Sequence, residues 1–449
     1  MKNQHLNKVL EDVQLRNPGE TEFIQAVTEV FESLDVVAEK RPDLVEAGIF
    51  DRIVEPERQI IFRVPWVDDQ GVVRVNRGFR IQFNSAIGPY KGGLRFHPSV
   101  NASIVKFLGF EQTFKNSLTG LPMGGGKGGS DFDPRGKSDL EIMRFCQSFM
   151  TELAKNIGAD TDVPAGDIGV GGREIGFLFG QYKRVRNEFS GVLTGKGEAY
   201  GGSLIRPEAT GYGATYFAQE MMKVNGEEIK GKTFVVSGYG NVAWGAVKKI
   251  TELGGKVLTI SGSAGYIYDE EGVGSSQEKI DYMLEMRENS NGGIQDYAEK
   301  FGVPFFPGEK PWGVKADVVM PCATQNEVNF EDATHIVANG TRYYVEASNM
   351  STTPHAMEYL KKQKVSIGPA KAANAGGVAV SGLEMSQNSL RYNWTKEKVD
   401  AKLRHIMVNI FQACKESAEE YGLDGDYCAG ANIAGFMRVA EAMKAQGVV

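Results

Sequence analysis

The sequence has few of the residues that build metal sites or disulfide frameworks. Its 449 residues include four cysteines and five histidines. No two cysteines form a Cys-x-x-Cys pair and no histidine cluster accompanies them, so we expect neither a disulfide framework nor a metal site. The default interpretation is free, buried thiols in a reducing compartment, which predicts a cytoplasmic protein.

Two further absences exclude other classes of protein. The chain has no run of about 18 apolar residues, which argues against a membrane span, and residues 1–5 lack the apolar core of a secretory signal. The formal net charge of −7 argues against general nucleic-acid binding, which usually needs a basic face. A locally basic site for a small acidic substrate stays open. The length predicts two or three domains.

Glycine is plentiful, with 55 residues, and the most unusual stretch is Leu121–Ser130. In it Lys127 stands alone among Gly124, Gly125, Gly126, Gly128 and Gly129. We expect a loop here, because glycine lets the backbone turn and approach a ligand closely. If Lys91 and Lys115 point into the same cleft, burial and like charges lower the pKa of Lys127, which then suits a base or nucleophile. The alternative is a flexible or phosphate-holding loop with a solvated lysine.

The apolar spacing in the first 200 residues predicts both helices and strands. It predicts helices over 21–37, 101–117 and 138–157, and strands over 59–64 and 72–83 joined by a turn at 68–71. Gln112 and Lys115 are one turn apart on the second of these helices. Asp167 lies in a glycine-rich stretch. It can face a ligand closely, or it can cap the helix that begins near Gly172.

Past Thr210 strands alternate with helices, which predicts a parallel sheet covered on both faces. The helices are expected at 242–253 and 399–421, and the strands at 233–236, 257–260, 316–320, 336–338, 343–347 and 365–367. The stretch Gly238–Ala243 reads GxGxxA between a strand and a helix, as in dinucleotide-binding turns. The following strand ends at Ser261 without an acidic residue, so these residues leave NAD and NADP both open.

Seven stretches share the pattern of one family and run in order from Phe62 to the C-terminus. They are Gly-Pro-Tyr-Lys-Gly-Gly-Leu-Arg-Phe, Lys-Phe-Leu-Gly-Phe-Glu-Gln, Leu-Pro-Met-Gly-Gly-Gly-Lys-Gly-Gly, Val-Pro-Ala-Gly-Asp-Ile-Gly-Val-Gly, Arg-Pro-Glu-Ala-Thr-Gly-Tyr-Gly, Pro-Cys-Ala-Thr-Gln-Asn and Asn-Ala-Gly-Gly-Val-Ala-Val-Ser-Gly-Leu-Glu. Together they resemble the hexameric glutamate dehydrogenases of the Glu/Leu/Phe/Val dehydrogenase family, in the small microbial and protist type.

The resemblance implies an α/β fold of two domains with a cleft between them. The expected N-terminal α/β domain binds substrate and mediates oligomerisation, and it spans residues 1–200, completed by about 428–449. A Rossmann-like, doubly wound dinucleotide-binding domain is expected at 201–427. The resemblance also implies a homohexamer.

The resemblance further implies reversible oxidative deamination of L-glutamate to 2-oxoglutarate and ammonium, with NAD or NADP as cofactor. Lys127 and Asp167 match the catalytic residues of the family. The residues matching its substrate contacts are Lys115, Gln112 and Gly166 for the α-carboxylate, Lys91 and Ser381 for the side-chain carboxylate, and Asn374 in the same cleft. The residues matching its cofactor contacts are Thr210, Gly238, Gly240, Asn241, Val242, Ser261, Ala323, Thr324 and Asn349.

Two alternative functions stay open. Dehydrogenases of other amino acids in the family have an apolar residue in place of Lys91, so that lysine together with Ser381 argues against them. A non-catalytic, nucleotide-binding regulator is expected to lack Lys127 or Asp167, and both are present. For the cofactor, Trp244 and Gly262 favour NAD, whereas Ala264 replaces an aspartate of the relatives that use NAD. The choice is left open, with a slight preference for NAD.

Overall fold

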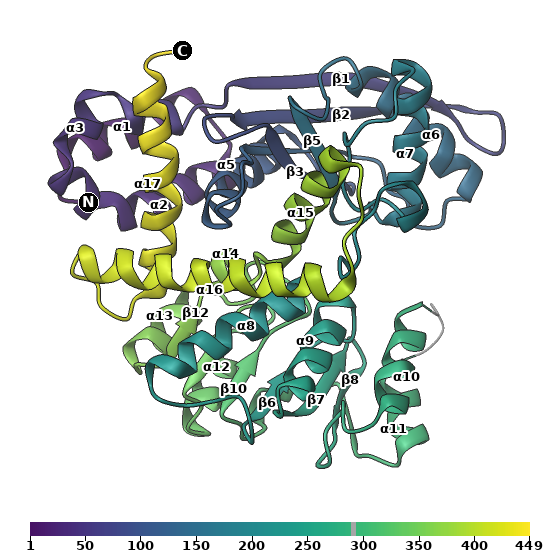
Figure 1. Cartoon of the computed structure of the whole chain (residues 1–449), viewed down its shortest axis with the longest axis vertical. Coiled ribbons are helices and arrows are strands. Elements are labelled where there is room, and N and C mark those ends of the chain that lie inside the picture. The colour runs from purple at the N-terminus through teal and green to yellow at the C-terminus, as the bar shows by residue number, and fades with distance from the viewer. Residues whose placement is uncertain (289–292) are drawn as a thin grey trace. The chain divides into compact units, whose positions relative to one another are not determined.

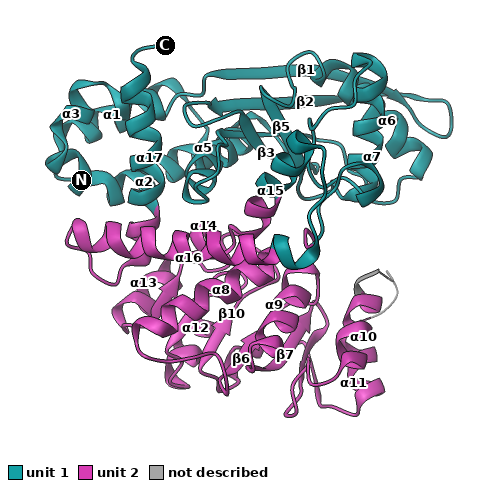
Figure 2. Cartoon of the chain, viewed as in Figure 1, with its two compact units in different colours: residues 1–204, 381–399, 432–449 teal, residues 205–380, 400–431 magenta. Residues whose placement is uncertain are grey.

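The computed structural model describes residues 1–288 and 293–449. The chain divides into two compact units, coloured separately in Figure 2. Unit 1 contains Met1–Leu204, Ser381–Val399 and Asn432–Val449, and unit 2 contains Ile205–Val380 and Asp400–Ala431. Each unit has its own β-sheet, so the fold is mixed α/β as expected.

Unit 1 is built on a five-stranded sheet with the order β1-β2-β4-β3-β5. The strands are β1 (Arg58–Val67), β2 (Val73–Asn84), β3 (Tyr90–Phe96), β4 (Gly125–Ser130) and β5 (Asp162–Gly166). β1, β2 and β4 pair antiparallel, whereas β4, β3 and β5 pair parallel. The predicted strands at 59–64 and 72–83 and the turn between them are confirmed.

The glycine-rich stretch around Lys127 is not the predicted loop. Gly125–Ser130 forms β4, which is entirely buried and bonded to a neighbour on each side. The reason is close packing: a Cβ at Gly125 would lie 2.6 Å from the Cα of Thr113 on the neighbouring helix, and one at Gly128 would lie 2.7 Å from a Phe79 oxygen. The glycines therefore allow tight helix–strand and strand–strand contacts rather than flexibility.

Helices of unit 1 pack on both its sheet and each other (Figure 1). They are α1 (Gln4–Arg16), α2 (Thr21–Lys40), α3 (Pro42–Glu46), α4 (Ile49–Ile53), α5 (Ala102–Leu118), α6 (Asp139–Leu153), α7 (Gly172–Arg186) and η1 (Glu198–Tyr200). The predicted helices at 21–37, 101–117 and 138–157 correspond to α2, α5 and α6. The apolar side of α6 and α7 buries aromatic residues against β1 and β3, as in the edge-to-face rings of Phe96 on β3 and Phe145 on α6 at 5.1 Å.

The sheet of unit 2 has the order β12-β11-β10-β6-β7-β8-β9. Its strands are β6 (Thr233–Val236), β7 (Lys256–Gly262), β8 (Gly265–Tyr268), β9 (Phe305–Pro307), β10 (Val318–Met320), β11 (Tyr343–Val345) and β12 (Ser366–Gly368). The five strands from β12 to β7 are parallel, and β8 and β9 extend the sheet antiparallel. The parallel strands have the order 2-1-3-4-5 of a doubly wound fold, with the topological switch between β6 and β10.

Unit 2 contributes most of the remaining helices. They are α8 (Ala209–Val224), α9 (Asn241–Glu252), α10 (Gln277–Glu288), α11 (Ile294–Phe301), η2 (Pro311–Gly313), α12 (Phe330–Ala338), α13 (Pro354–Lys362) and α14 (Ala370–Ala373). Three helices cross between units in the sequence: α15 (Gly376–Leu390), α16 (Lys396–Glu420) and α17 (Tyr427–Gln446). Within 1–288 and 293–449, no helix is both long and apolar enough to cross a membrane.

The predicted strand at 336–338 is wrong, because these residues form the last turn of α12. The short apolar run Ile-Val-Ala fits either element, and the helix is selected by its beginning. Asn329 caps α12 by accepting a hydrogen bond from the Asp332 N–H, and the Asp332 carboxylate accepts one from the Asn329 N–H in return. This reciprocal cap satisfies the N–H groups of Asn329 and Asp332, which have no partner inside the helix, and so favours a helix that begins here.

Candidate active site

Lys127 and Asp167 lie together in unit 1, as predicted. Lys127 is in β4, and Asp167 directly follows β5. The Lys127 Nζ lies 3.4 Å from Oδ2 of Asp167, and the Arg95 Nε donates a hydrogen bond to the same oxygen at 2.9 Å. Each of the three side chains is at most 17% exposed. The structure therefore places a third charged group beside the predicted catalytic pair.

The space for this cluster depends on Gly93, which lies between Lys91 and Arg95 in β3. A Cβ at Gly93 would lie 2.9 Å from the Cβ of Asp167 and 2.7 Å from the Gly166 oxygen. Glycine thus allows Asp167 to approach the strand closely. The alternative role of Asp167 as a helix cap is wrong, because α7 begins at Gly172 with Gly171 at its N-cap.

Burial and charge shift the protonation of both predicted catalytic groups. Burial lowers the pKa of Lys127 and outweighs the opposing attraction of Asp167, while the positive charge of Arg95 lowers this pKa further. For Asp167, burial raises the pKa of the carboxyl, but the charges of Lys127 and Arg95 outweigh burial and leave this pKa below its usual range. The pair therefore combines a lysine biased toward the neutral amine with an ionised carboxylate.

Lys91 and the helix α5 lie next to this pair. Lys91 is 1% exposed, and its Nζ donates a hydrogen bond to Oγ1 of Thr194 at 2.8 Å. Gln112 and Lys115 are both partly exposed on α5, one turn apart. Asn116 of α5 donates from Nδ2 to the Lys91 carbonyl oxygen at 2.9 Å, which ties the helix to β3. The backbone of Gly166 pairs with β3 at Leu94.

Ser381 reaches the same part of unit 1 through α15. Three residues after Ser381, the fully buried Glu384 accepts a hydrogen bond from the Gly195 N–H at 2.9 Å and forms an ion pair with Lys196 Nζ at 2.9 Å. Gly195 directly follows Thr194, the acceptor for Lys91. Segment 194–196 therefore connects Lys91 with the helix that carries Ser381. A buried pair of this kind is costly to break, by roughly 3–5 kcal/mol, because one charge is left uncompensated.

In unit 2 the GxGxxA stretch forms the turn between β6 and α9. Gly238 has a φ of +78°, which favours glycine, and α9 begins at Asn241 after Gly240. Among the described residues, no side chain caps the α9 N-terminus. Its first N–H groups and the helix dipole therefore suit the pyrophosphate of a dinucleotide. Val242 and Asn241 lie in this first turn.

The remaining predicted cofactor residues of unit 2 lie after β10, near the end of β7 and at the start of α8. Ala323 and Thr324 are exposed after β10, and a Cβ at Gly238 would lie 3.2 Å from the Ala323 Cα. The Ser261 hydroxyl accepts a hydrogen bond from the Gly238 N–H at 3.0 Å, so it supports the turn. Thr210 lies at the start of α8, where a Cβ at Gly377 would come within 2.6 Å of its Oγ1.

Two asparagines complete this edge of unit 2. Asn374, predicted as a substrate contact, lies in unit 2 and donates from Nδ2 to Oδ1 of the exposed Asn349 at 2.8 Å. The Oδ1 atom of Asn374 is buried and has no hydrogen-bond partner within the described part of the chain. An unsatisfied buried acceptor suits a ligand that carries a donor, such as an amide or an ammonium group.

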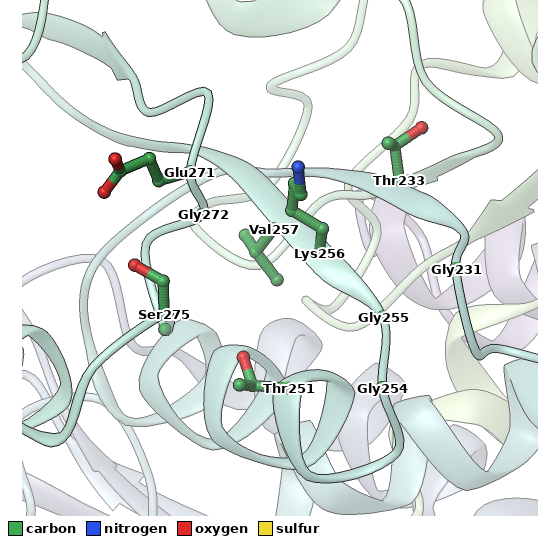
Figure 3. Close-up of a pocket in the computed structure, with 11 residues that line it drawn as sticks. Gly231, Thr233, Thr251, Gly254, Gly255, Lys256, Val257, Glu271, Gly272 and Ser275 are labelled. Atoms are coloured by element: carbon green, nitrogen blue, oxygen red, sulfur yellow. The ribbon is translucent and has the colours of Figure 1, made fainter.

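A hollow of about 260 Å³ lies at the opposite edge of the unit 2 sheet (Figure 3). It is lined by Thr233 and Lys256 at the amino ends of β6 and β7 and by Glu271 in the loop after β8. None of the predicted site residues lines it. In doubly wound folds ligands bind at the carboxyl ends of the strands, so this hollow is not the expected nucleotide site.

Sequence reasoning assigned no role to three residues that the structure places at the site. They are Arg95, Thr194 and Glu384. A signal for Arg95 was available, since Lys91, Gly93 and Arg95 alternate and therefore lie on one face of a strand. Thr194 and Glu384 had none, because their contacts join segments about 100 and 190 residues apart in the sequence.

Comparisons with known proteins agree with this architecture. Residues 201–447 match the family model for Glutamate/Leucine/Phenylalanine/Valine dehydrogenase, and residues 56–184 match that for the Glu/Leu/Phe/Val dehydrogenase dimerisation domain. The NAD-specific glutamate dehydrogenase of Clostridium symbiosum is 58% identical over 447 residues, covering 99% of each chain. The NADP-specific enzyme of Giardia intestinalis is 57% identical over 450 residues, again covering 99% of each.

A solved structure of a glutamate dehydrogenase superposes with a TM-score of 0.97 at 57% identity, with complete coverage of both chains. Family models that match the chain in both units, together with relatives above 50% identity along its whole length, leave no part of the fold unaccounted for. The chain belongs to the Glu/Leu/Phe/Val dehydrogenase family.

Proposed function

We propose that this chain is a glutamate dehydrogenase that converts L-glutamate, water and NAD or NADP reversibly into 2-oxoglutarate, ammonium and the reduced cofactor. The observation that carries the proposal is the buried Lys127–Asp167 pair at 3.4 Å, with the buried cation Lys91 nearby in the same unit. The full-length similarity to glutamate dehydrogenases supports it. A dicarboxylic substrate needs cations for two carboxylates, and Lys91 and Lys115 supply them.

Lys127 and Asp167 divide the proton transfers between them. A bound nicotinamide cofactor would supply the hydride acceptor, and loss of hydride from Cα would leave an iminium carbon on the substrate. A neutral Lys127 amine takes a proton from the water that attacks this carbon. The Asp167 carboxylate exchanges a proton with the substrate nitrogen as ammonium leaves. Their burial keeps the amine available and strengthens the charge–charge contacts.

The other predicted residues hold the two ends of the substrate and the cofactor. Lys115, Gln112 and the Gly166 backbone bind the α-carboxylate, and Lys91 with Ser381 binds the side-chain carboxylate. On the cofactor, the turn at Gly238, Gly240, Asn241 and Val242 binds the pyrophosphate. Ala323 and Thr324 would contact the nicotinamide ribose, and Ser261 would lie at the ribose whose 2′ position distinguishes NAD from NADP. Thr210 and Asn349 would also contact the cofactor, and Asn374 would contact the substrate in the same cleft.

Direct assays run in parallel with NADH and with NADPH test this function. We expect the absorbance of reduced nicotinamide to fall when 2-oxoglutarate and ammonium are added with either NADH or NADPH. The first acid after β7, Asp269, is buried and its carboxylate is engaged in an ion pair with Lys279 at 2.7 Å. Without the several kcal/mol of repulsion that a carboxylate imposes on a phosphate, we expect kcat/KM to favour NADH by less than about 100-fold.

The outcome separates function from cofactor choice. If neither cofactor is oxidised with 2-oxoglutarate but one is oxidised with an apolar 2-oxo acid, the substrate is an amino acid other than glutamate. No oxidation with any 2-oxo acid would favour a non-catalytic regulator. A preference above about 1,000-fold for one cofactor would show that another group of the protein distinguishes the ribose 2′-hydroxyl of NAD from the 2′-phosphate of NADP.

We further propose a cytoplasmic homohexamer assembled through the first domain. Here residues 1–200, completed by about 428–449, bind substrate and mediate assembly, and 201–427 bind the dinucleotide. The cytoplasmic assignment is supported by four free cysteines. Assembly is supported by the match to a dimerisation domain and by apolar side chains exposed on β1 and β2, where Ile61, Val73 and Val75 are 56%, 66% and 61% exposed.

Light scattering at micromolar concentration measures this assembly. We expect a mass about six times the 49.1 kDa of the chain, because closed symmetric assembly covers the exposed β1–β2 face. Replacing Val73 and Val75 by lysine is expected to lower the mass, whereas Leu15→Lys, at an apolar residue exposed elsewhere, should not. A monomeric mass for the unmodified chain would contradict the proposal.

A further inference from the structure

Arg95 belongs to the stretch Gly-Gly-Leu-Arg-Phe but has no role in the function described so far. We infer that Arg95 is a positioning residue of the reaction: it holds Asp167 through the oxygen that faces Lys127, and it thereby keeps Lys127 from having a full counter-ion. This inference rests on the proposed function and assigns a task to a residue that contacts neither of the two substrate carboxylates in that scheme.

Arg95 and Lys127 lie at unequal distances from Oδ2 of Asp167. Arg95 Nε lies at 2.9 Å, within hydrogen-bond distance, whereas Lys127 Nζ lies at 3.4 Å, beyond the usual range. The carboxylate is therefore aligned by the guanidinium and only loosely paired with the amine. Because Arg95 lies in β3 and Asp167 directly follows β5, this bond also fixes the segment after β5 against the sheet.

The charges of the cluster do not balance. Arg95 and Lys127 carry two positive charges against one negative charge on Asp167. A guanidinium does not lose its proton in proteins, so the excess positive charge is relieved at Lys127. Arg95 thus favours the neutral amine that the reaction needs, and it keeps the Asp167 carboxylate ionised.

Other charged groups surround Lys127 from each neighbouring element. Arg80 of β2 is fully buried and forms an ion pair with Asp162 of β5, and its positive charge also lowers the pKa of Lys127, though by less than that of Arg95. Lys91 of β3 donates to the neutral Thr194, and Lys115 lies on α5. Arg95 differs from them because it shares the oxygen of Asp167 with Lys127.

The test compares the pH dependence of kcat/KM in variants that keep or remove the charge. Arg95→Gln is expected to raise the pKa of both Lys127 and Asp167, since a like charge is lost beside the amine and a counter-charge beside the carboxylate. The rising limb of the profile should therefore move to higher pH by about one unit. Arg95→Lys keeps the charge and should leave the limb near its original position. Arg135→Gln removes an exposed partner of Asp133 and is the matched control.

A second measurement follows the protonation of Lys127 without requiring turnover. Cyanate reacts with neutral amines, so the rate of carbamylation of Lys127, followed by mass spectrometry across pH, reports its protonation. Lys155, which is 63% exposed, is an internal reference in the same sample. We expect Lys127 to reach half its maximal rate at lower pH than Lys155, and this difference to shrink in Arg95→Gln. Arg95→Met serves the same purpose if the glutamine variant does not fold.

Each outcome decides the inference. If the rising limb of the pH profile stays in place in both Arg95→Gln and Arg95→Met and turnover is merely reduced, the role of Arg95 is structural. A limb that moves equally in Arg95→Lys would show that shape rather than charge is responsible. Neither result affects the proposed function, which instead fails if Lys127→Ala retains turnover.

Discussion

Replacing Lys127 by alanine is expected to lower kcat for glutamate by roughly 10³–10⁴-fold, the upper range for loss of a general base. Lys127 is buried in β4 beside Asp167, and its lowered pKa favours the neutral amine. Because β4 is otherwise glycine and serine, the truncation changes no other large side chain of that strand, and Asp167 keeps its hydrogen bond from Arg95. Turnover is measured by the absorbance of reduced nicotinamide, in both directions of the reaction.

Two controls keep this result specific to chemistry. Lys155→Ala removes an exposed lysine of the same unit and should leave kcat unchanged. Circular dichroism and fluorescence titration with the reduced cofactor should show that Lys127→Ala folds and binds as before, since the predicted cofactor contacts lie in unit 2. A folded Lys127→Ala protein with kcat within threefold of the parent value would refute the catalytic role.

Changing the pocket for the side-chain carboxylate is expected to change the substrate. In the double variant Lys91→Leu with Ser381→Val, a buried cation and a buried hydroxyl are replaced by apolar groups. Glutamate then has to bury an unpaired carboxylate at a cost of several kcal/mol, so kcat/KM for glutamate should fall by about 1,000-fold or more. Use of an apolar amino acid such as norvaline should rise, because the new pocket matches its side chain.

The ratio of the two substrates is the measurement that decides this prediction, because it cancels a general loss of activity. Lys183→Leu, at an exposed position on α7, is the matched control and should leave the ratio unchanged. If the double variant still prefers glutamate by the original ratio, Lys91 and Ser381 do not bind the side-chain carboxylate. The Thr194 and Glu384 contacts would then be purely structural.

The local sequence pattern was sufficient to predict those elements whose signal lies within a few consecutive residues. The stripe of α2, the spans of β1 and β2 and the turn at Gly238 depend on neighbours a few residues apart, and all were predicted. The predicted polar face of β2 is wrong, because Arg80 and Gln82 are buried as well. The local pattern also predicted the pairing of residue types at the site. A single lysine among glycines and an aspartate among small residues indicated close approach to a ligand before any contact was known.

What only the tertiary structure decided are the features made by distant partners. The sequence alone suggested a loop around Lys127, because glycine favours turns in isolation, but pairing with β2 and β3 and packing by α5 turn it into a buried strand. Likewise, Arg95 meets Asp167 across 72 residues, and Glu384 meets Gly195 across 189. The sequence determined the family, most of the element types and the candidate catalytic pair. The fold decided which charges share an oxygen, because that depends on strand order and not on spacing.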